Sequence, residues 1–139
     1  MKRVFISQPM KDKTDEEILA EREQAIKNVK NHFWINGGVE EEEIEFIDSF
    51  FEEAPENASP LWFLGKSIEL LATADVVYFC KGWIRARGCV IEYLCAFLYG
   101  VGSILCAGED TPDDFYDAST VMAISVLTGA INNRPKESK

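Results

Sequence analysis

The stretch DVVYFC, residues 75–80, decides the fold class of this chain. After its first residue it is apolar throughout, which is typical of a strand buried on both faces of a parallel sheet. Three other short β-rich runs accompany it: KRVFIS at 2–7, IEFID at 44–48 and SILCA at 103–107. Because helical patterns alternate with these runs, the sequence predicts an α/β fold. We expect a flavodoxin- or Rossmann-like three-layer sandwich with a four- to five-stranded parallel sheet.

Two helices begin at capping signals. Thr14 and Glu17 form a capping-box pattern, which satisfies backbone amides that the first helical turn leaves unpaired. Ser59 followed by Pro60 supplies an N-cap and a first-turn proline for a helix over 60–72.

The sequence of the second half predicts one further helix, and two interpretations remain for the C-terminal segment. A helix is expected over 87–100, closed by Gly100 or Gly102. The segment 111–139 has the character of either a β-rich run or a helix, and its length favours the helix. In such an alternating fold, ligands bind at the carboxyl ends of the strands.

The composition indicates a single domain over residues 1–139 and excludes several classes of function. Hydrophobic residues make up 47% of the chain, and the net charge is −10. This charge argues against binding to nucleic-acid polymers, which require a basic surface. The longest apolar run contains glycines and is too short to span a membrane, and the N-terminus lacks the apolar core of a signal peptide. We therefore expect a cytoplasmic protein that does not bind membranes.

The cysteines and the histidine do not form a metal-binding pattern. The four cysteines stand at positions 80, 89, 95 and 106 without a CxxC pair, and His32 is the single histidine. We interpret the cysteines as small hydrophobic core residues, and we expect neither a metal nor another cofactor.

The stretch GWIRARGCVIEYLCAFLYG, residues 82–100, contains one carboxylate, Glu92. The positions three and four residues away on a helix hold no charge, so no ion pair along the helix explains this glutamate. The helix macrodipole favours an anion near the N-terminus, so Glu92 could stay ionised without a cation. An ionised carboxylate that faces a cleft can attack an electrophilic carbon, as in glycosyl transfer. The alternative is a solvated glutamate on the helix surface.

Three segments together resemble the nucleoside 2-deoxyribosyltransferase-like superfamily, and in particular a small phage and bacterial branch of largely unassigned function. They are VFISQPM at 4–10, ATADVVYF at 72–79 and the 82–100 stretch with its Gly88 to Glu92 step. The resemblance covers about residues 2–107. It implies that Glu92 is a catalytic nucleophile that forms a glycosyl-enzyme at C1′ of the sugar.

The chain departs from the superfamily pattern at two acidic positions. Members carry an aspartate before the third strand that handles the leaving base, and Ser67 stands at the matching position here. An acid often precedes the glycine of the Glu step, whereas this chain has Arg87 there. Two functions therefore remain open: an N-glycosidase or 2-deoxyribosyltransferase, and a non-catalytic nucleotide-binding protein, such as a sensor, on the same fold.

A basic cluster in the 82–100 stretch suggests an anionic group on the ligand. Arg85 and Arg87, with Lys81 nearby, stand out in an acidic chain, and the arginine fork suits a 5′-phosphate. The alternative is a solvated loop, or ion pairs with surface acids. Trp83 could stack on a base or close the core beneath the loop.

The remaining predicted substrate-binding residues lie at strand ends or in the resembling motifs. Ser7 and Gln8 offer a hydroxyl and an amide for hydrogen bonds with a sugar or base, although polar residues also occur there for turn geometry alone. The others are Pro9, Met10, Asp48, Gly82 and Gly88. The expected ligand is a nucleoside or nucleoside monophosphate. The resemblance also implies a homo-oligomer, and the apolar run VMAISVLTGAI at 121–131 suits a buried subunit contact.

Overall fold

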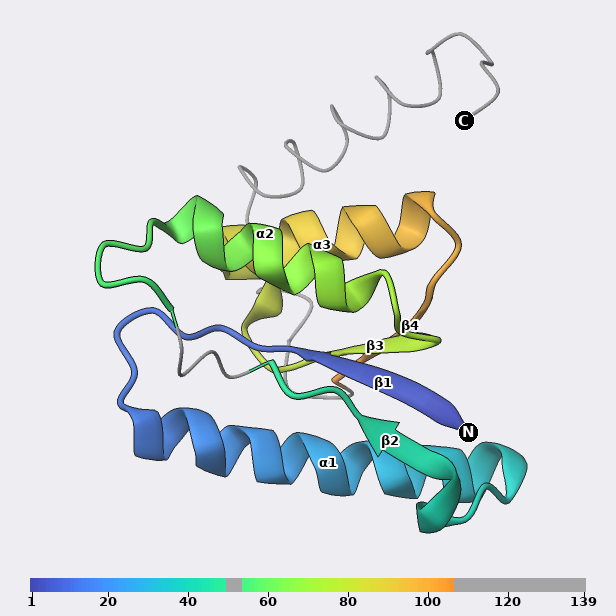
Figure 1. Cartoon of the computed structure of the whole chain (residues 1–139). Helices are drawn as coiled ribbons and strands as arrows, with labels where there is room; N and C mark the ends of the chain where they lie inside the picture. The colour runs from blue at the N-terminus through green and yellow to red at the C-terminus, as the bar shows by residue number, and fades with distance from the viewer. Residues whose placement is uncertain (50–53, 107–139) are drawn as a thin grey trace, which may run out of the picture.

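The computed structural model describes residues 1–49 and 54–106, and it has a parallel sheet between two layers of helices (Figure 1). The predicted α/β sandwich is confirmed. Two short 3-10 turns, η1 (Glu41–Glu43) and η2 (Trp83–Arg85), accompany the helices and strands. The regular elements are β1 (Lys2–Ser7), α1 (Asp15–Gly37), β2 (Ile44–Phe46), α2 (Pro60–Leu71), β3 (Val76–Phe79), α3 (Arg87–Leu98) and β4 (Gly102–Leu105).

All four strands of the described sheet are parallel, in the order β2-β1-β3-β4. The predicted central strand, β3, lies inside the sheet, between β1 and β4. Ser7 pairs with Phe79, and Phe79 pairs with Leu105, so these three strands end at one edge. One further bond, from Cys80 N to Ser7 O at 2.9 Å, ties the ends of β1 and β3 together.

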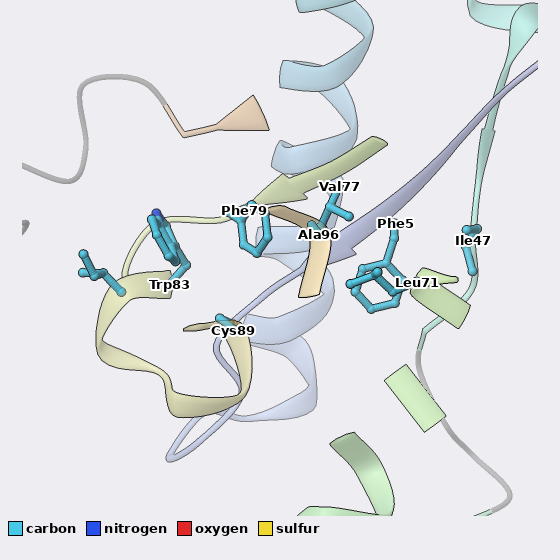
Figure 2. Close-up of a cluster of buried hydrophobic side chains, with 9 residues drawn as sticks. Phe5, Ile47, Leu71, Val77, Phe79, Trp83, Cys89 and Ala96 are labelled. Atoms are coloured by element: carbon cyan, nitrogen blue, oxygen red, sulfur yellow. The ribbon is translucent and has the colours of Figure 1, made fainter. Parts of the chain in front are cut away.

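Alternation along the strands divides the core into two clusters. Val4 and Ile6 of β1 face α1 and pack with its Ala25 and Val29. Phe5 points to the opposite face, into a cluster that lies beneath α2 and α3. Figure 2 shows most of that cluster, whose buried members are Phe5, Ile47, Leu71, Val77, Phe79, Trp83, Ile84, Cys89 and Ala96.

The N-cap of α1 lies where the sequence predicts it. The Thr14 hydroxyl accepts a hydrogen bond from Glu17 N at 3.2 Å. At the other end, Gly38 takes φ 63°, a left-handed conformation that a residue without Cβ adopts at little cost. Both ends of the helix are therefore capped.

The second strand is shorter than the predicted 44–48 run, because a side chain takes over its pairing. Ile47 N still donates to Val4 O at 2.9 Å. The guanidinium of Arg22 then binds Ile47 O at 2.8 Å and Ser49 Oγ at 3.3 Å, which turns the chain away from the sheet.

The other boundaries differ by one or two residues from the predictions. Helix α2 ends at Leu71 instead of residue 72, and α3 ends at Leu98, with Gly100 in a left-handed conformation after it. The fourth strand spans Gly102–Leu105 instead of 103–107. The predicted segment 111–139 lies outside the described residues. Within the described part of the chain, no helix combines the length and apolar character needed to cross a bilayer.

Candidate functional site

The carboxyl ends of β1 and β3 form the edge at which a ligand site is expected. Helix α1 follows β1 and packs on one face of the sheet, whereas α3 follows β3 and packs on the other. Ligands of doubly wound sheets bind at such a point, where neighbouring strands send the chain in opposite directions. Ser7 and the loop at 80–86 therefore border the expected site.

Glu92 lies in the second turn of α3 and is buried, with 7% of its surface exposed. It is the one buried charged residue among those that the structure describes. Its Oε2 atom has no hydrogen-bond partner in the described part of the chain. The alternative of a solvated surface glutamate is therefore wrong.

Burial also changes the ionisation of this carboxyl. Desolvation raises the pKa of Glu92 from 4.5 to about 7, and the Ser7 hydroxyl offsets part of the rise. Burial therefore opposes the ionisation of Glu92 that the helix macrodipole was predicted to favour. Both the acid and the carboxylate form of Glu92 are therefore accessible near neutral pH.

Ser7 lies beside Glu92 because the pleat of β1 turns it toward α3, on the same face as Phe5. Ser7 is 1% exposed, and its Oγ makes no hydrogen bond of good geometry with any described residue. It is nevertheless close enough to lower the pKa of both Glu92 and Cys89. The Ser7 hydroxyl thus favours the ionised form of the Glu92 carboxyl, whereas burial opposes it.

Cys89 also lies near Ser7 and Glu92, although it was not among the predicted site residues. It is 4% exposed, one turn before Glu92 on α3. Burial and the Glu92 charge raise the pKa of its thiol to about 12, so it stays protonated. Cys89 could have been predicted near the site, because residues three positions apart on a helix lie on the same face.

Open space adjoins Gly88, one turn before Glu92. A Cβ added at Gly88 would meet no described atom within 4 Å. Side chains of a helix lean toward its N-terminus, so the Glu92 side chain is directed toward this turn. The space beside Gly88 therefore borders the turn of α3 that precedes Glu92.

Trp83 belongs to the core. It is 1% exposed, and its ring packs against Phe79 at 5.3 Å and Tyr93 at 4.9 Å between centroids. Trp83 lies at one end of the cluster in Figure 2, with Ile47 at the other. Of the two interpretations of Trp83, this position agrees with core packing beneath the loop, and it does not offer a ring face to a base.

The two arginines flank the start of α3. Both Arg85 and Arg87 are exposed, and α3 begins at Arg87. The N-cap residue, Ala86, has no side chain that could bind the first amides of the helix. Lys81 is exposed at the end of β3. Positive side chains and a helix N-terminus thus occur together at the predicted edge.

The residues that follow β1 diverge from one another. Gln8 points to the α1 side, where its Nε2 donates to Ile18 O at 2.9 Å, so this buried amide has a structural partner on the opposite face from Glu92. Pro9 lies beside Gly82: a Cβ on that glycine would be 3.8 Å from Pro9 Cγ. Met10 is 40% exposed.

The two remaining positions lie farther along the fold. Asp48 is exposed after β2, and its charge acts on the guanidinium of Arg22. Ser67 lies half-buried in α2. No other carboxylate among the described residues is buried beside Glu92. Because position 67 holds a serine instead of an aspartate, the candidate site has a single buried acid.

Two surface hollows lie away from Glu92. One, of about 430 Å³, lies on the α1 face of the sheet, and its lining includes Lys13, Asn28, Tyr78 and Cys80. The other, of about 360 Å³, lies at the opposite edge, near Met1 and Asp75. Neither of the two hollows includes Glu92 in its lining.

Two of the four cysteines, Cys80 and Cys89, are buried core residues as predicted. All four cysteines are free; Cys80 and Cys89 are buried, and Cys95 and Cys106 are half-buried. Within residues 1–49 and 54–106, no group of three or more histidine, cysteine or acidic side chains is arranged to hold a metal ion.

Comparison with known proteins supports the fold. The structure resembles the crystal structure of a conserved protein from Enterococcus faecalis V583, with a TM-score of 0.54 and 12% sequence identity. The match covers 92% of this chain and 75% of the other. No family model and no curated protein sequence matches the chain. At this identity the likeness extends to the α/β fold alone.

Proposed function

We propose that the protein is an N-glycosidase or 2-deoxyribosyltransferase that acts on a nucleoside or nucleoside monophosphate through Glu92. The observation that carries this proposal is the Glu92 carboxyl itself, which is buried at the carboxyl edge of a parallel sheet with Oε2 unpartnered. A buried carboxyl group without a partner is costly to keep, so a position of this kind is typical of a group that acts on a ligand.

The proposed reaction has two steps. The ionised Glu92 carboxylate attacks C1′ of the sugar, and the bond from C1′ to the base breaks as the ester bond forms. The base leaves with the electron pair of that bond and takes a proton. Water, or a second base, then attacks C1′ and releases Glu92, which gives hydrolysis or transfer respectively.

The arginines would bind the 5′-phosphate of a nucleotide substrate. Arg85 and Arg87 flank the N-terminus of α3, and Glu92 lies one turn farther along the same helix. A phosphate held there would fix the sugar relative to the carboxylate, since guanidinium groups and helix amides both bind phosphate oxygens.

A second candidate is a non-catalytic nucleotide-binding protein with the same site. The observation that favours it is the isolation of Glu92: Ser67 is not an acid, and burial holds the pKa of Glu92 near 7, which reduces the fraction of the nucleophilic form. In this case Glu92 would accept a hydrogen bond from the ligand and would form no covalent bond.

A panel of nucleosides and 5′-monophosphates, incubated with the protein and analysed by chromatography for released base, separates these functions. Glu92→Gln keeps the shape of the side chain but removes the attacking charge. For an enzyme, base release should fall by orders of magnitude while binding changes only a few-fold. A 2′-fluoro-2′-deoxy analogue with an activated leaving group should leave a sugar adduct on Glu92, detectable by mass spectrometry. Binding without release or adduct would support the second candidate.

A further inference from the structure

The hollow of about 430 Å³ on the α1 face of the sheet has the position and the size of a small-molecule site. It lies at the carboxyl ends of β3 and β4, because Cys80, Lys81 and Cys106 all contribute to its lining. Ligands of parallel sheets bind at this edge. Its volume falls within the roughly 300–1,000 Å³ that is usual for ligand pockets. The side chains of α1 and of the strand ends therefore decide what this hollow can bind.

A chain of hydrogen bonds fixes two side-chain amides of α1 on one wall of the hollow. Gln24 Nε2 donates to Asn28 Oδ1 at 2.9 Å, and Asn28 Nδ2 donates to the Tyr78 hydroxyl at 3.0 Å. Tyr78 is 3% exposed and anchors this chain of bonds to β3. A primary amide has two N–H groups. Each of the two amides therefore keeps one N–H that no described residue accepts.

Two lysines and one acid line the same hollow. Lys13 Nζ donates to the two carboxylate oxygens of Glu21 at 2.7 and 2.8 Å, so these two charges compensate each other. Lys81 is exposed just after β3, and its ammonium group makes no ion pair and no hydrogen bond with a described residue. The lining therefore carries one uncompensated positive charge, in a chain whose net charge is −10.

The remaining wall of the hollow is apolar or weakly polar. Ala25, Tyr78 and Cys80 belong to the buried cluster beneath α1, and Cys106 is half-buried against it. A cysteine thiol packs as a small hydrophobic group and makes favourable contacts with aromatic rings. This wall is therefore suited to an apolar body, next to the polar groups of α1 and Lys81.

The polar groups that remain in the lining are mostly hydrogen-bond donors. An ammonium group such as that of Lys81 has three N–H groups, and Gln24 and Asn28 keep one N–H each. The carbonyl oxygen of the Gln24 amide is the acceptor beside them. A carboxylate or phosphate accepts several such bonds at once, and bonds to a charged acceptor are about twice as strong as neutral ones.

We propose that this hollow is a binding site for a small organic acid. The carboxylate or phosphate of the ligand lies against Lys81 and the two amides, and its apolar body contacts Ala25 and the cysteines. The residues of the proposed reaction, Glu92, Arg85 and Arg87, do not line this hollow. Binding here therefore does not depend on catalysis at Glu92.

Three probes of similar shape separate the effect of charge from that of size: benzoate, phenyl phosphate and the neutral benzamide. Titration of the full chain, followed by nitrogen–proton NMR correlation spectra, reports both the affinity and the place of binding. We expect the anions to shift the side-chain amide signals of Gln24 and Asn28 and the backbone signal of Lys81. Benzamide should bind about tenfold more weakly or worse, because it lacks the charge-assisted contacts. Whichever anion binds more tightly identifies the head group.

Two substitutions and a matched control test the residues. Lys81→Ala should weaken binding of the anions by about tenfold. Lys27→Ala removes an exposed lysine of α1 that does not line the hollow, so it should leave the affinity nearly unchanged. Asn28→Asp keeps the size of the side chain and can accept a hydrogen bond from the Tyr78 hydroxyl, so it should fold, which circular dichroism checks. It places a carboxylate beside the ligand anion and should abolish binding.

Three results would overturn this assignment. Equal affinity for benzamide and for the anions would show that the hollow does not select charge. Equal losses in Lys81→Ala and Lys27→Ala would replace a specific contact with general electrostatic attraction. Signals that shift in α3 alone, or no shifts at millimolar probe concentration, would leave the hollow without a ligand, whether or not the protein releases a base through Glu92.

Discussion

The Ser7 hydroxyl and the Glu92 carboxyl meet at the carboxyl edge of the sheet, although they come from β1 and from α3, 85 residues apart along the chain. Neither buried atom, Ser7 Oγ or Glu92 Oε2, has a hydrogen-bond partner among the described residues. The sheet order brings them together, because β1 and β3 are neighbours and α3 folds back over the face to which Ser7 points. Burial raises the pKa of Glu92, and the Ser7 hydroxyl offsets part of that rise.

The pH dependence of base release should report that ionisation. Because burial raises the pKa of Glu92 to about 7 and attack requires the carboxylate, kcat/KM should rise about tenfold per pH unit below 7 and level off above it. In Ser7→Ala, the loss of the hydroxyl that lowers this pKa should move the midpoint to higher pH. An unchanged midpoint in Ser7→Ala would show that the hydroxyl does not influence the carboxyl group.

Glu92 should make folding stability depend on pH. Its pKa is 4.5 when unfolded and about 7 when folded, so between these values the folded state holds more protons and stability falls as pH rises. The penalty is absent below pH 4.5, complete above about pH 7 and worth about 3 kcal/mol. Glutamine at position 92 does not titrate. The free energy of unfolding of Glu92→Gln, measured with urea, should therefore increase relative to that of the wild type by about this amount between pH 4.5 and 7.5. A constant difference across that range would contradict the burial of a titrating Glu92.

Local sequence patterns predicted most helices and strands. The features that they did not predict depend on contacts between residues far apart in the sequence. The apolar run at 75–80 predicted a central strand, because a strand flanked by neighbours and covered on both faces needs apolar residues throughout. The early end of β2 could not be predicted, since it depends on Arg22, a residue of α1 that reaches over the sheet. The burial of Glu92 depends in the same way on packing between distant segments, and a helix pattern alone does not reveal it.

One part of the site, the separate directions of Ser7 and Gln8, could be predicted from the alternation of side chains along β1. Alternation places Ser7 with Phe5 and opposite Ile6, so a period of two was enough to separate Ser7 from Gln8. The two were instead predicted together as ligand-binding groups. In the structure, Gln8 binds Ile18 O on the α1 side, whereas Ser7 lies on the α3 side with Phe5.

The N-cap of α1 should make a measurable contribution to stability. Thr14→Ala removes the side-chain oxygen that accepts from Glu17 N at 3.2 Å, and it should lower the free energy of unfolding by about 1 kcal/mol. Thr14→Ser retains the hydroxyl and should stay close to the wild type. Urea denaturation of the three proteins measures the difference, and equal midpoints for Ala and Ser would show that the cap contributes nothing.

The arginines at the start of α3 should distinguish nucleotides from nucleosides. Replacement of both Arg85 and Arg87 with alanine should weaken binding of a 5′-monophosphate by tenfold or more, because a charge-assisted contact contributes about 1.5–3 kcal/mol. Binding of the matching nucleoside should change little. A variant that loses two positive charges elsewhere, Lys2→Ala with Lys27→Ala, controls for net charge, since both lysines are exposed and away from this edge. Calorimetric titration that gives equal losses for both ligands in the arginine variant would assign the cluster a structural role instead.

An apolar surface on α2 and α3 motivates a prediction about assembly. Leu61 at the start of α2, and Phe97 and Tyr99 at the end of α3, are 75%, 62% and 78% exposed, and large exposed apolar side chains of this kind are candidates for contacts between subunits. We propose that the protein forms a homo-oligomer through this surface, and sedimentation at micromolar concentration should then give a mass above the 15.7 kDa of one chain.

The apolar surface can be tested directly by adding charge to it. Leu61→Asp should shift the protein toward the monomer, because association would bury an unpaired carboxylate. Leu19→Asp serves as the matched control: Leu19 is also exposed, at 49%, but it belongs to α1 on the opposite face of the sheet. If the two variants sediment alike, or if the wild type is a monomer throughout, the surface of α2 and α3 does not mediate assembly. A shift toward the monomer in Leu61→Asp alone would locate the subunit contact on the same side of the sheet as Glu92. Base release by that variant would then show whether activity requires the oligomer.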